Sequence, residues 1–180
     1  SNDDGYVWAT PDSPLHLNAT FGCHYSLNPI YILAIRNYLL QCNRQGKFND
    51  DGTEFTEFLN LTNTQGQSIQ YKVDKAMSYM MNTLSGKTGI MTINDPAKDG
   101  TTSGMSSNYW DVHKTFGYMS AYENAYFYAS LLAYADIYDF KADNYAKNGQ
   151  SAEAEKARDV AEEYRGYAAV TREKYNTLFW

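Results

Sequence analysis

Residues 104–118, GMSSNYWDVHKTFGY, combine the side chains of this sequence that are best suited to chemistry. Asp111 directly follows Trp110, and a segment rich in tyrosine comes next in the chain. An aspartate at this position can cap a helix, fix a loop by accepting backbone N–H bonds, bind a sugar or donate a proton. The tryptophan can stack on a sugar ring or anchor the loop in a core. The residue types alone leave these roles open.

Other side chains of the same stretch can contact a substrate. An asparagine offers the paired donor and acceptor that sugar hydroxyls need, and histidine and lysine also bind hydroxyls. The tyrosines line a pocket in one interpretation and pack the loop in another, and a solvated face is the simpler interpretation of the lysine. We therefore predict a substrate-binding set of Asn108, Tyr109, Trp110, His113, Lys114 and Tyr118. His24, Tyr25 and Trp8, which precede the first expected helix, are further candidates for the same cleft.

We expect neither a metal nor a cofactor. The 3 histidines lack the i,i+4 pairing of zinc proteases. Cys23 and Cys42 have no CxxC spacing, so we expect free buried thiols, although the sequence leaves a disulfide open. Asp95 and Asp99 in NDPAKDG are typical turn residues, and their stretch does not match a calcium-binding EF-hand loop.

The composition limits the class of partner. The 180 residues carry a net charge of −6 and no block of Lys and Arg, which argues against nucleic acid and anionic membrane as partners. No apolar run is long enough to span a bilayer, so we expect no membrane insertion. The aromatic content of 16%, with 17 tyrosines, is typical of a tyrosine-rich core or of a wet cavity lined with rings. The compartment stays unknown, with a slight preference for the periplasm or the exterior over the cytoplasm.

Hydrophobic patterns predict an all-α fold of four helices. The first helix should begin at Asn28-Pro29, a cap and first-turn signal, and continue as IYILAIRNYLLQC, which is apolar nearly all round. The second, from Ser68 to Leu84, is amphipathic, with a wet face composed of Gln70, Lys72, Asp74 and Lys75.

The third helix should start near Ser120, which has capping-box spacing to Glu123, and is again apolar all round. The fourth, from Ser151 towards Leu178, is amphipathic and carries i,i+3 pairs such as Glu162/Arg165 on its wet face. A long loop, about 86–117, separates the second helix from the third, and its GIMTI stretch is a candidate short strand.

The order buried, amphipathic, buried, amphipathic indicates helical hairpins in two layers, with inner helices covered on all sides. A plain four-helix bundle would instead give four amphipathic helices. No repeat of fixed period is present, which argues against an ordinary helical-repeat solenoid.

The chain resembles the six-hairpin glycosidases, the group of glucoamylase, trehalase and the debranching glucosidases, and is similar to bacterial members. HYSLNPIYILAIRNYLLQC resembles an inner helix of these proteins. The stretch from DKAMSYMMNTL through NYWDVHKTFGY to AYADIYD resembles an outer helix, the long loop and the next inner helix, and EYRGYAAVTREKYNTLFW resembles the following outer helix. The resemblance implies an (α/α)6 toroid and spans most of the chain.

The resemblance also implies a role for Asp111, because several branches place the general acid beside or just after a Trp in such a loop. Glycoside hydrolysis uses two carboxyl groups, one protonated, and an inverting enzyme separates them by roughly 6.5–9.5 Å. A neighbouring ring desolvates the acid and raises its pKa. The sequence offers no convincing base, which the group usually supplies from a later part of the toroid.

We therefore expect a glycoside hydrolase fragment, with residues 1–180 forming about half of a larger (α/α)6 catalytic domain. The partners would be an oligosaccharide, an α-glucoside by analogy, and the remainder of the toroid. Three alternatives stay open: a glycan-binding protein without catalysis, for which YAKNGQSAEAEKARDVAEEY suits a tetratricopeptide-like hairpin, a sugar epimerase with catalytic histidines, and a plain scaffold.

Overall fold

The computed structural model describes residues 27–48, 52–92 and 119–180. Within these ranges the chain is helical and contains no strand, only an isolated bridge between Thr62 and Ser68. The all-α class is thus confirmed. The helices are α1 (Leu27–Arg44), α2 (Thr53–Asn60), α3 (Ile69–Ser78), α4 (Ala121–Lys147) and α5 (Ser151–Phe179), and α3 continues into a π-helical turn (Tyr79–Thr83) and a 3-10 turn (Gly86–Thr88).

The helix starts follow local capping chemistry. The Ser68 side chain accepts a hydrogen bond from the Tyr71 amide at the start of α3, and Ser120 accepts one from the Glu123 amide at the start of α4. Each bond satisfies a backbone donor that the first turn leaves unpaired. Both predicted starts are therefore confirmed. The predicted cap at Asn28 is wrong, because α1 already includes Leu27 and the Asn28 side chain is buried against α3.

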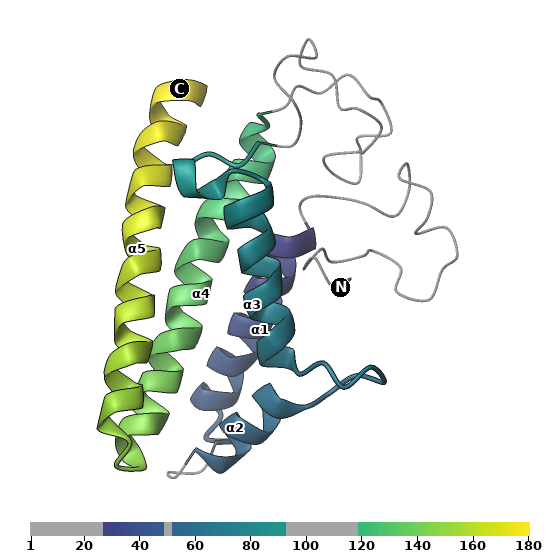
Figure 1. Cartoon of the computed structure of the whole chain (residues 1–180), viewed down its shortest axis with the longest axis vertical. Helices are drawn as coiled ribbons and strands as arrows, with labels where there is room; N and C mark the ends of the chain where they lie inside the picture. Colours follow the sequence, from purple (N-terminus) through teal and green to yellow (C-terminus); the bar gives the residue numbers. More distant parts are fainter. Residues whose placement is uncertain (1–26, 49–51, 93–118) are drawn as a thin grey trace.

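The helices form two antiparallel hairpins, one of α1 and α3 and the other of α4 and α5 (Figure 1). The second hairpin closes through a short turn at Gly149, whose φ of 72° lies in the left-handed region that glycine adopts without strain. Helices α1 and α4 lie side by side and run in the same direction, and α3 and α5 run in the other (Figure 1).

Helix α4 is the most buried element of the fold. The consecutive residues Ala133, Tyr134 and Ala135 are all buried although an α-helix turns by about 100° per residue. Helix α5 instead buries a single stripe and exposes its charged face. The buried residues of this stripe are Ala154, Ala157, Ala161, Ala168 and Thr171. The predicted contrast between a covered third helix and an amphipathic fourth helix is confirmed.

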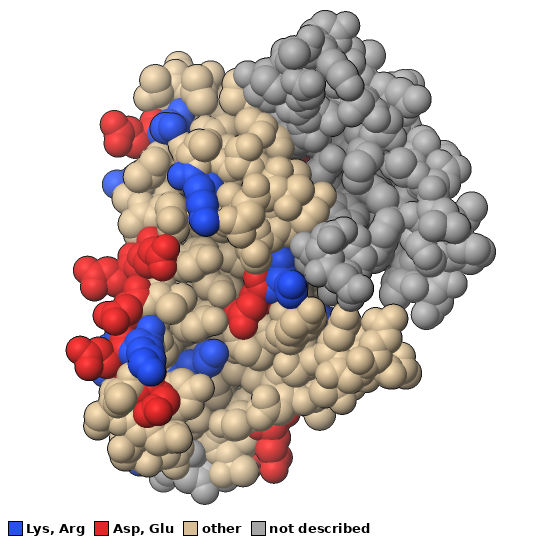
Figure 2. Space-filling view, in the orientation of Figure 1, with Lys and Arg blue, Asp and Glu red and all other residues tan. Residues whose placement is uncertain are grey.

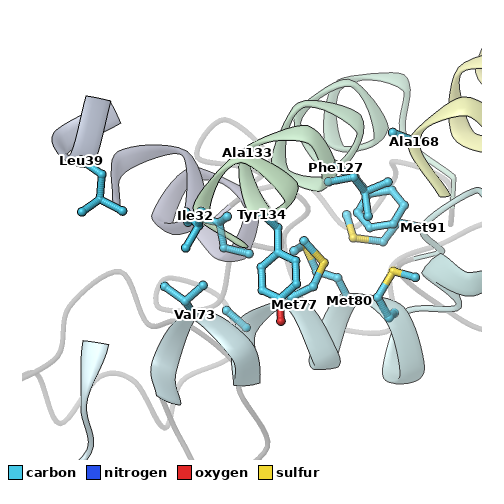
Figure 3. Packing of buried hydrophobic residues seen from close by; sticks show 14 of the residues in the cluster. Ile32, Leu39, Val73, Met77, Met80, Met91, Phe127, Ala133, Tyr134 and Ala168 are labelled. Atoms are coloured by element: carbon cyan, nitrogen blue, oxygen red, sulfur yellow. The ribbon is translucent and has the colours of Figure 1, made fainter. Parts of the chain in front are cut away.

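The core lies where α4 meets α1, α3 and the chain that follows α3 (Figure 3). Met77, Met80, Met91 and Phe127 pack together and are fully buried. A Cβ atom at Gly86 would lie 2.7 Å from both the Phe127 ring and the Met80 carbonyl oxygen, so only glycine lets the 3-10 turn approach α4 this closely. The apolar face predicted for residues 68–84 thus forms part of the core.

Several expectations are wrong. Helix α1 is not covered on most faces, since Ile30 and Tyr38 are 38% and 50% exposed. The described part of GIMTI, residues 89–92, forms no strand, because Met91 pairs with a side chain of α4 rather than with another backbone segment.

Helix α2 was not expected from the sequence. Cys42 is a buried free thiol, as predicted, and Cys23 lies outside the described residues.

No helix in the described part of the chain is long and apolar enough to cross a membrane.

Two adjacent leucines of α4 test the burial pattern. Leu131 is fully buried and Leu132 is 36% exposed. Leu131→Ala should lower the free energy of unfolding by about 2–5 kcal/mol, because it leaves a cavity in the core. Leu132→Ala, the matched control, should change it by about 0.5 kcal/mol. Urea unfolding of both variants measures the difference, and equal losses would contradict the packing of α4.

Candidate functional site

The predicted site residues lie outside the described residues, so their roles stay predictions. These residues are Trp8, His24, Tyr25, Asn108, Tyr109, Trp110, Asp111, His113, Lys114 and Tyr118. The structure does place the positions where their two segments join the described chain. Residues 1–26 join the described chain at Leu27, where α1 begins. Residues 93–118 join it at Thr92 on one side and at Met119 on the other.

Hydrogen bonds from side-chain amides hold the described chain in place at these junctions. The Asn124 side chain pairs with Met91 as a strand backbone would: the Met91 amide donates to Oδ1 (2.6 Å), and Nδ2 donates to the Met91 carbonyl (3.0 Å). The same Nδ2 also donates to the Ser120 carbonyl (2.9 Å). These bonds hold the end of the chain after α3 against the first turn of α4. Residues 93–118 therefore leave and re-enter the described fold at neighbouring points.

A similar contact fixes the start of α1. Asn28, which is fully buried, donates from Nδ2 to the Ala76 carbonyl in α3 (3.1 Å). Both α1 and α4 consequently begin towards the end of the fold where α3 finishes. Glu123 is also fully buried in the first turn of α4. An acidic side chain in this position interacts favourably with the partial positive charge of a helix N-terminus.

A second polar cluster connects α3 to α4 near the middle of the fold. Oδ1 of Asp74 accepts hydrogen bonds from the hydroxyls of Tyr134 (2.9 Å) and Tyr138 (3.0 Å) and from Nε2 of Gln70 (2.7 Å). Figure 3 shows the Tyr134 ring among the core side chains with its hydroxyl directed towards α3. Gln70 and Asp74, which were predicted to lie on a wet face, are half-buried, and Asp74 also faces α4 because buried tyrosine hydroxyls need an acceptor.

Burial keeps the tyrosines of this cluster protonated. Desolvation, followed by the negative charge of Asp74, raises the pKa of Tyr134 and of Tyr138 far above the usual value. Tyr164 of α5 packs on Tyr134 with ring centroids 4.5 Å apart, and burial raises its pKa to about 12. Tyr134 and Tyr138 therefore act as neutral hydrogen-bond donors from α4 to α3, and Tyr164 packs on Tyr134 from α5.

Lys141 lies about one turn after Tyr138 in α4 and lines a hollow in the surface. Its ammonium group lies 4.3 Å from the centroid of the Tyr138 ring. Desolvation lowers the pKa of Lys141, and the Asp74 carboxylate partly opposes this shift. The adjoining hollow measures about 140 Å³ and is lined by both polar and aromatic side chains: Phe55, Thr56, Leu59, Asn60, Gln70, Lys141, Asn144 and Tyr145.

Ion pairs connect α4 to both of its neighbouring helices. Arg36 of α1 binds Oδ2 of Asp136 through Nε (2.8 Å) and a terminal nitrogen (2.6 Å). Arg165 of α5 pairs with Asp139 and lies 3.9 Å from the other oxygen of Asp136. Charged side chains gather along the α5 side of the molecule (Figure 2). Arg165, predicted to pair with Glu162 along its own helix, thus reaches across to α4.

No group of three or more His, Cys, Asp and Glu within the described ranges is arranged to hold a metal ion. The cluster of Asp74, Tyr134 and Tyr138 was not expected from the sequence, although a signal was present. Gln70 and Asp74 are four residues apart, as are Tyr134 and Tyr138, so each pair lies on one helix face.

Comparison of the chain with models of known families, with curated proteins and with solved structures gives no match. The resemblance to the six-hairpin glycosidases therefore rests on the sequence motifs alone.

The tyrosine cluster predicts a loss of stability in alkali. An unfolded tyrosine ionises near pH 10, whereas folded Tyr164 ionises near pH 12. Its contribution to stability is complete below pH 10 and is lost as the pH rises through 12, because the unfolded chain releases its proton first. Tyr31, whose pKa burial also raises to about 12, adds to the effect. Denaturant unfolding at pH 9 to 12 should show this fall, and Tyr164→Phe should reduce it. A flat profile in the wild type would contradict the burial of these rings.

The hydrogen bonds to Asp74 predict coupling between α3 and α4. Tyr138→Phe should lower the unfolding free energy by about 1.5–3 kcal/mol, the range for a bond to a charged acceptor. In a double-mutant cycle with Asp74→Asn, the two changes should be non-additive. Additive losses, measured by the same unfolding experiment, would show that the two side chains do not interact.

Proposed function

We propose that the chain forms part of the catalytic domain of an inverting glycoside hydrolase built from α-helical hairpins. The observation that carries the proposal is the arrangement of α1 and α4. These helices run in the same direction, and each is paired with an antiparallel partner (Figure 1). The segments that contain the predicted site residues join the described chain next to the first turns of these two helices.

This arrangement suits the chemistry in two ways. Helix N-termini carry partial positive charge and N–H groups, which favour the oxygen-rich groups of a sugar substrate. The bonds of Asn124 to Met91 and Ser120 also provide a rigid base for residues 93–118. A general acid has to be held within hydrogen-bond reach of the leaving oxygen, so a fixed base for its segment is an advantage.

The roles follow from the two-carboxylate mechanism. Asp111, beside Trp110, would donate a proton to the leaving glycosidic oxygen. A carboxylate outside this chain would activate water on the opposite face of the sugar. Trp110 and Tyr109 would stack on the substrate, and Asn108, His113 and Lys114 would bind its hydroxyls. The remainder of the toroid is thus a required partner, and no cofactor takes part.

The tetratricopeptide alternative fits the fold less well. Helix α4 has 27 residues and α5 has 29, whereas a complete tetratricopeptide repeat of two helices has only about 34. Residues 145–164, which suggested that alternative, contain only the last three residues of α4, the turn and about the first half of α5.

The decisive experiment compares the natural protein that contains this chain with its Asp111→Asn variant on α- and β-linked oligosaccharides. Asp111→Asn should retain substrate binding and lose turnover by about 10²–10⁴-fold, the usual contribution of a general acid. Asp95→Asn, a predicted turn residue of the same segment, is the matched control and should retain turnover.

Two outcomes would contradict the proposal. Unchanged turnover in Asp111→Asn would remove the acid role. Saccharide binding by the wild type without cleavage of any oligosaccharide would replace the hydrolase with a glycan-binding protein.

A further inference from the structure

The turn between α4 and α5, residues 148–150, contains a reactive pair that the proposed hydrolysis does not use. Asn148 and Gly149 form the one Asn-Gly pair of the sequence. Asparagine deamidates most readily before glycine, because glycine has no side chain to hinder the attack of its backbone nitrogen on the asparagine amide. Residues 148–150 are exposed, so water reaches the pair. The turn is thus a candidate site of chemical modification.

The reaction makes a specific demand on the backbone. The nitrogen of Gly149 loses its proton and attacks Cγ of Asn148, and the side-chain nitrogen takes up a proton and leaves as ammonia. The five-membered succinimide ring then opens by addition of water to either carbonyl carbon, which gives aspartate or isoaspartate. The ring can close only when the Gly149 nitrogen is turned towards the Asn148 side chain.

The native turn holds this nitrogen away from the side chain. Asn148 has a ψ of 12°, so the Gly149 nitrogen nearly eclipses the backbone nitrogen of Asn148 rather than its Cβ atom. The Gly149 amide also donates to the Ala146 carbonyl (3.1 Å). The Gln150 amide donates to the Tyr145 carbonyl (2.9 Å). These two bonds form a Schellman motif, which satisfies the last carbonyl groups of a helix. Ring closure therefore requires the end of α4 to open.

Deamidation would in turn weaken the end of α4. Nδ2 of Asn148 donates to the Asn144 carbonyl (2.9 Å), and a carboxylate cannot donate this bond. A negative charge is also unfavourable at the C-terminal end of a helix, where the carbonyl groups give a partial negative charge. Isoaspartate additionally lengthens the backbone by one methylene group. Because the Asn144 side chain donates to Thr56 of α2 (2.9 Å), the change would reach the contact between α4 and α2.

We propose that Asn148 is a deamidation site controlled by opening of the α4–α5 turn. The closed turn protects the side chain, and each opening lets the Gly149 nitrogen attack it. The product does not revert to asparagine, so it accumulates with the time that the turn spends open and loosens the end of α4. This inference goes beyond the proposed hydrolase activity and does not depend on it, because it uses none of the predicted site residues.

Peptide mapping by mass spectrometry measures the reaction at each asparagine. The 180-residue chain is incubated at mildly alkaline pH, either folded or unfolded in guanidinium, and aspartate and isoaspartate at position 148 are quantified over time. We expect Asn148 to react at least about tenfold more slowly in the folded chain, because a local opening costs free energy. Asn176, which is exposed in α5 and precedes the β-branched Thr177, is the internal control and should react slowly in both states.

Three variants separate the turn from the rest of the chain. Ala146→Gly weakens the last turn of α4 at an exposed position. It should speed deamidation of Asn148 in the folded chain by about two- to fivefold, the equivalent of the helix propensity lost with glycine, and leave the rate in guanidinium unchanged. Asn148→Gln, which would need a six-membered ring, should stay unmodified on the same timescale. Asn148→Asp, which has the charge of the product, should raise the unfolding equilibrium constant by about two- to tenfold.

Protection of Asn148 in the folded chain, together with faster reaction in Ala146→Gly, supports the proposal. Equal rates in the folded and the unfolded chain would overturn it, because the turn would then give no protection. Absence of deamidation in guanidinium would overturn it as well, since position 148 would not be reactive. Protection that Ala146→Gly leaves unchanged would contradict control by the turn, and an Asn148→Asp variant as stable as the wild type would contradict the loosening of α4.

Discussion

The desolvation of α4 is the constraint on which the rest of this fold depends. A helix covered on nearly all sides cannot leave its polar side chains without partners, because each such group would cost free energy. The neighbouring elements provide these partners at three levels along α4. Asn124 pairs with the Met91 backbone, Tyr134 and Tyr138 donate to Asp74, and Asp136 binds Arg36 and Arg165. These contacts set how α4 lies against the chain around it.

The two ends of α4 differ in their surroundings. At its start, the bonds of Asn124 hold Met91 and Ser120 together, and this base is where the segment with the proposed general acid joins the fold. Near its other end, α4 and α2 line a polar hollow. The segment with the proposed general acid thus joins the fold at the end of α4 that lies away from this hollow.

The sequence predicted the helices well where hydrophobic period and capping agreed. Ser68 and Ser120 are caps, and the stripe of α5 is buried as its spacing indicated. Helix α2 was missed because its eight residues are too few for a clear period. The bonds of Asp74 to α4 were missed because periodicity does not reveal which polar side chains find a partner in another helix. Arg165 was misassigned for the same reason, since an acid on α4 competes with the acids of its own helix. The hollow beside Lys141 depends on contacts between residues far apart in the chain, so no local pattern could indicate it.

Native-state hydrogen exchange, read amide by amide, tests the central role of α4 most directly. If the partners of α4 organise the fold, the amides in the middle of α4 and the amide of Met91 should exchange only by global unfolding, with the largest opening free energies in the described chain. The ends of α5, which pack only along one stripe, should open earlier. Exchange of the Met91 amide or of the middle of α4 by a local opening, at a lower free energy than in α5, would contradict the account.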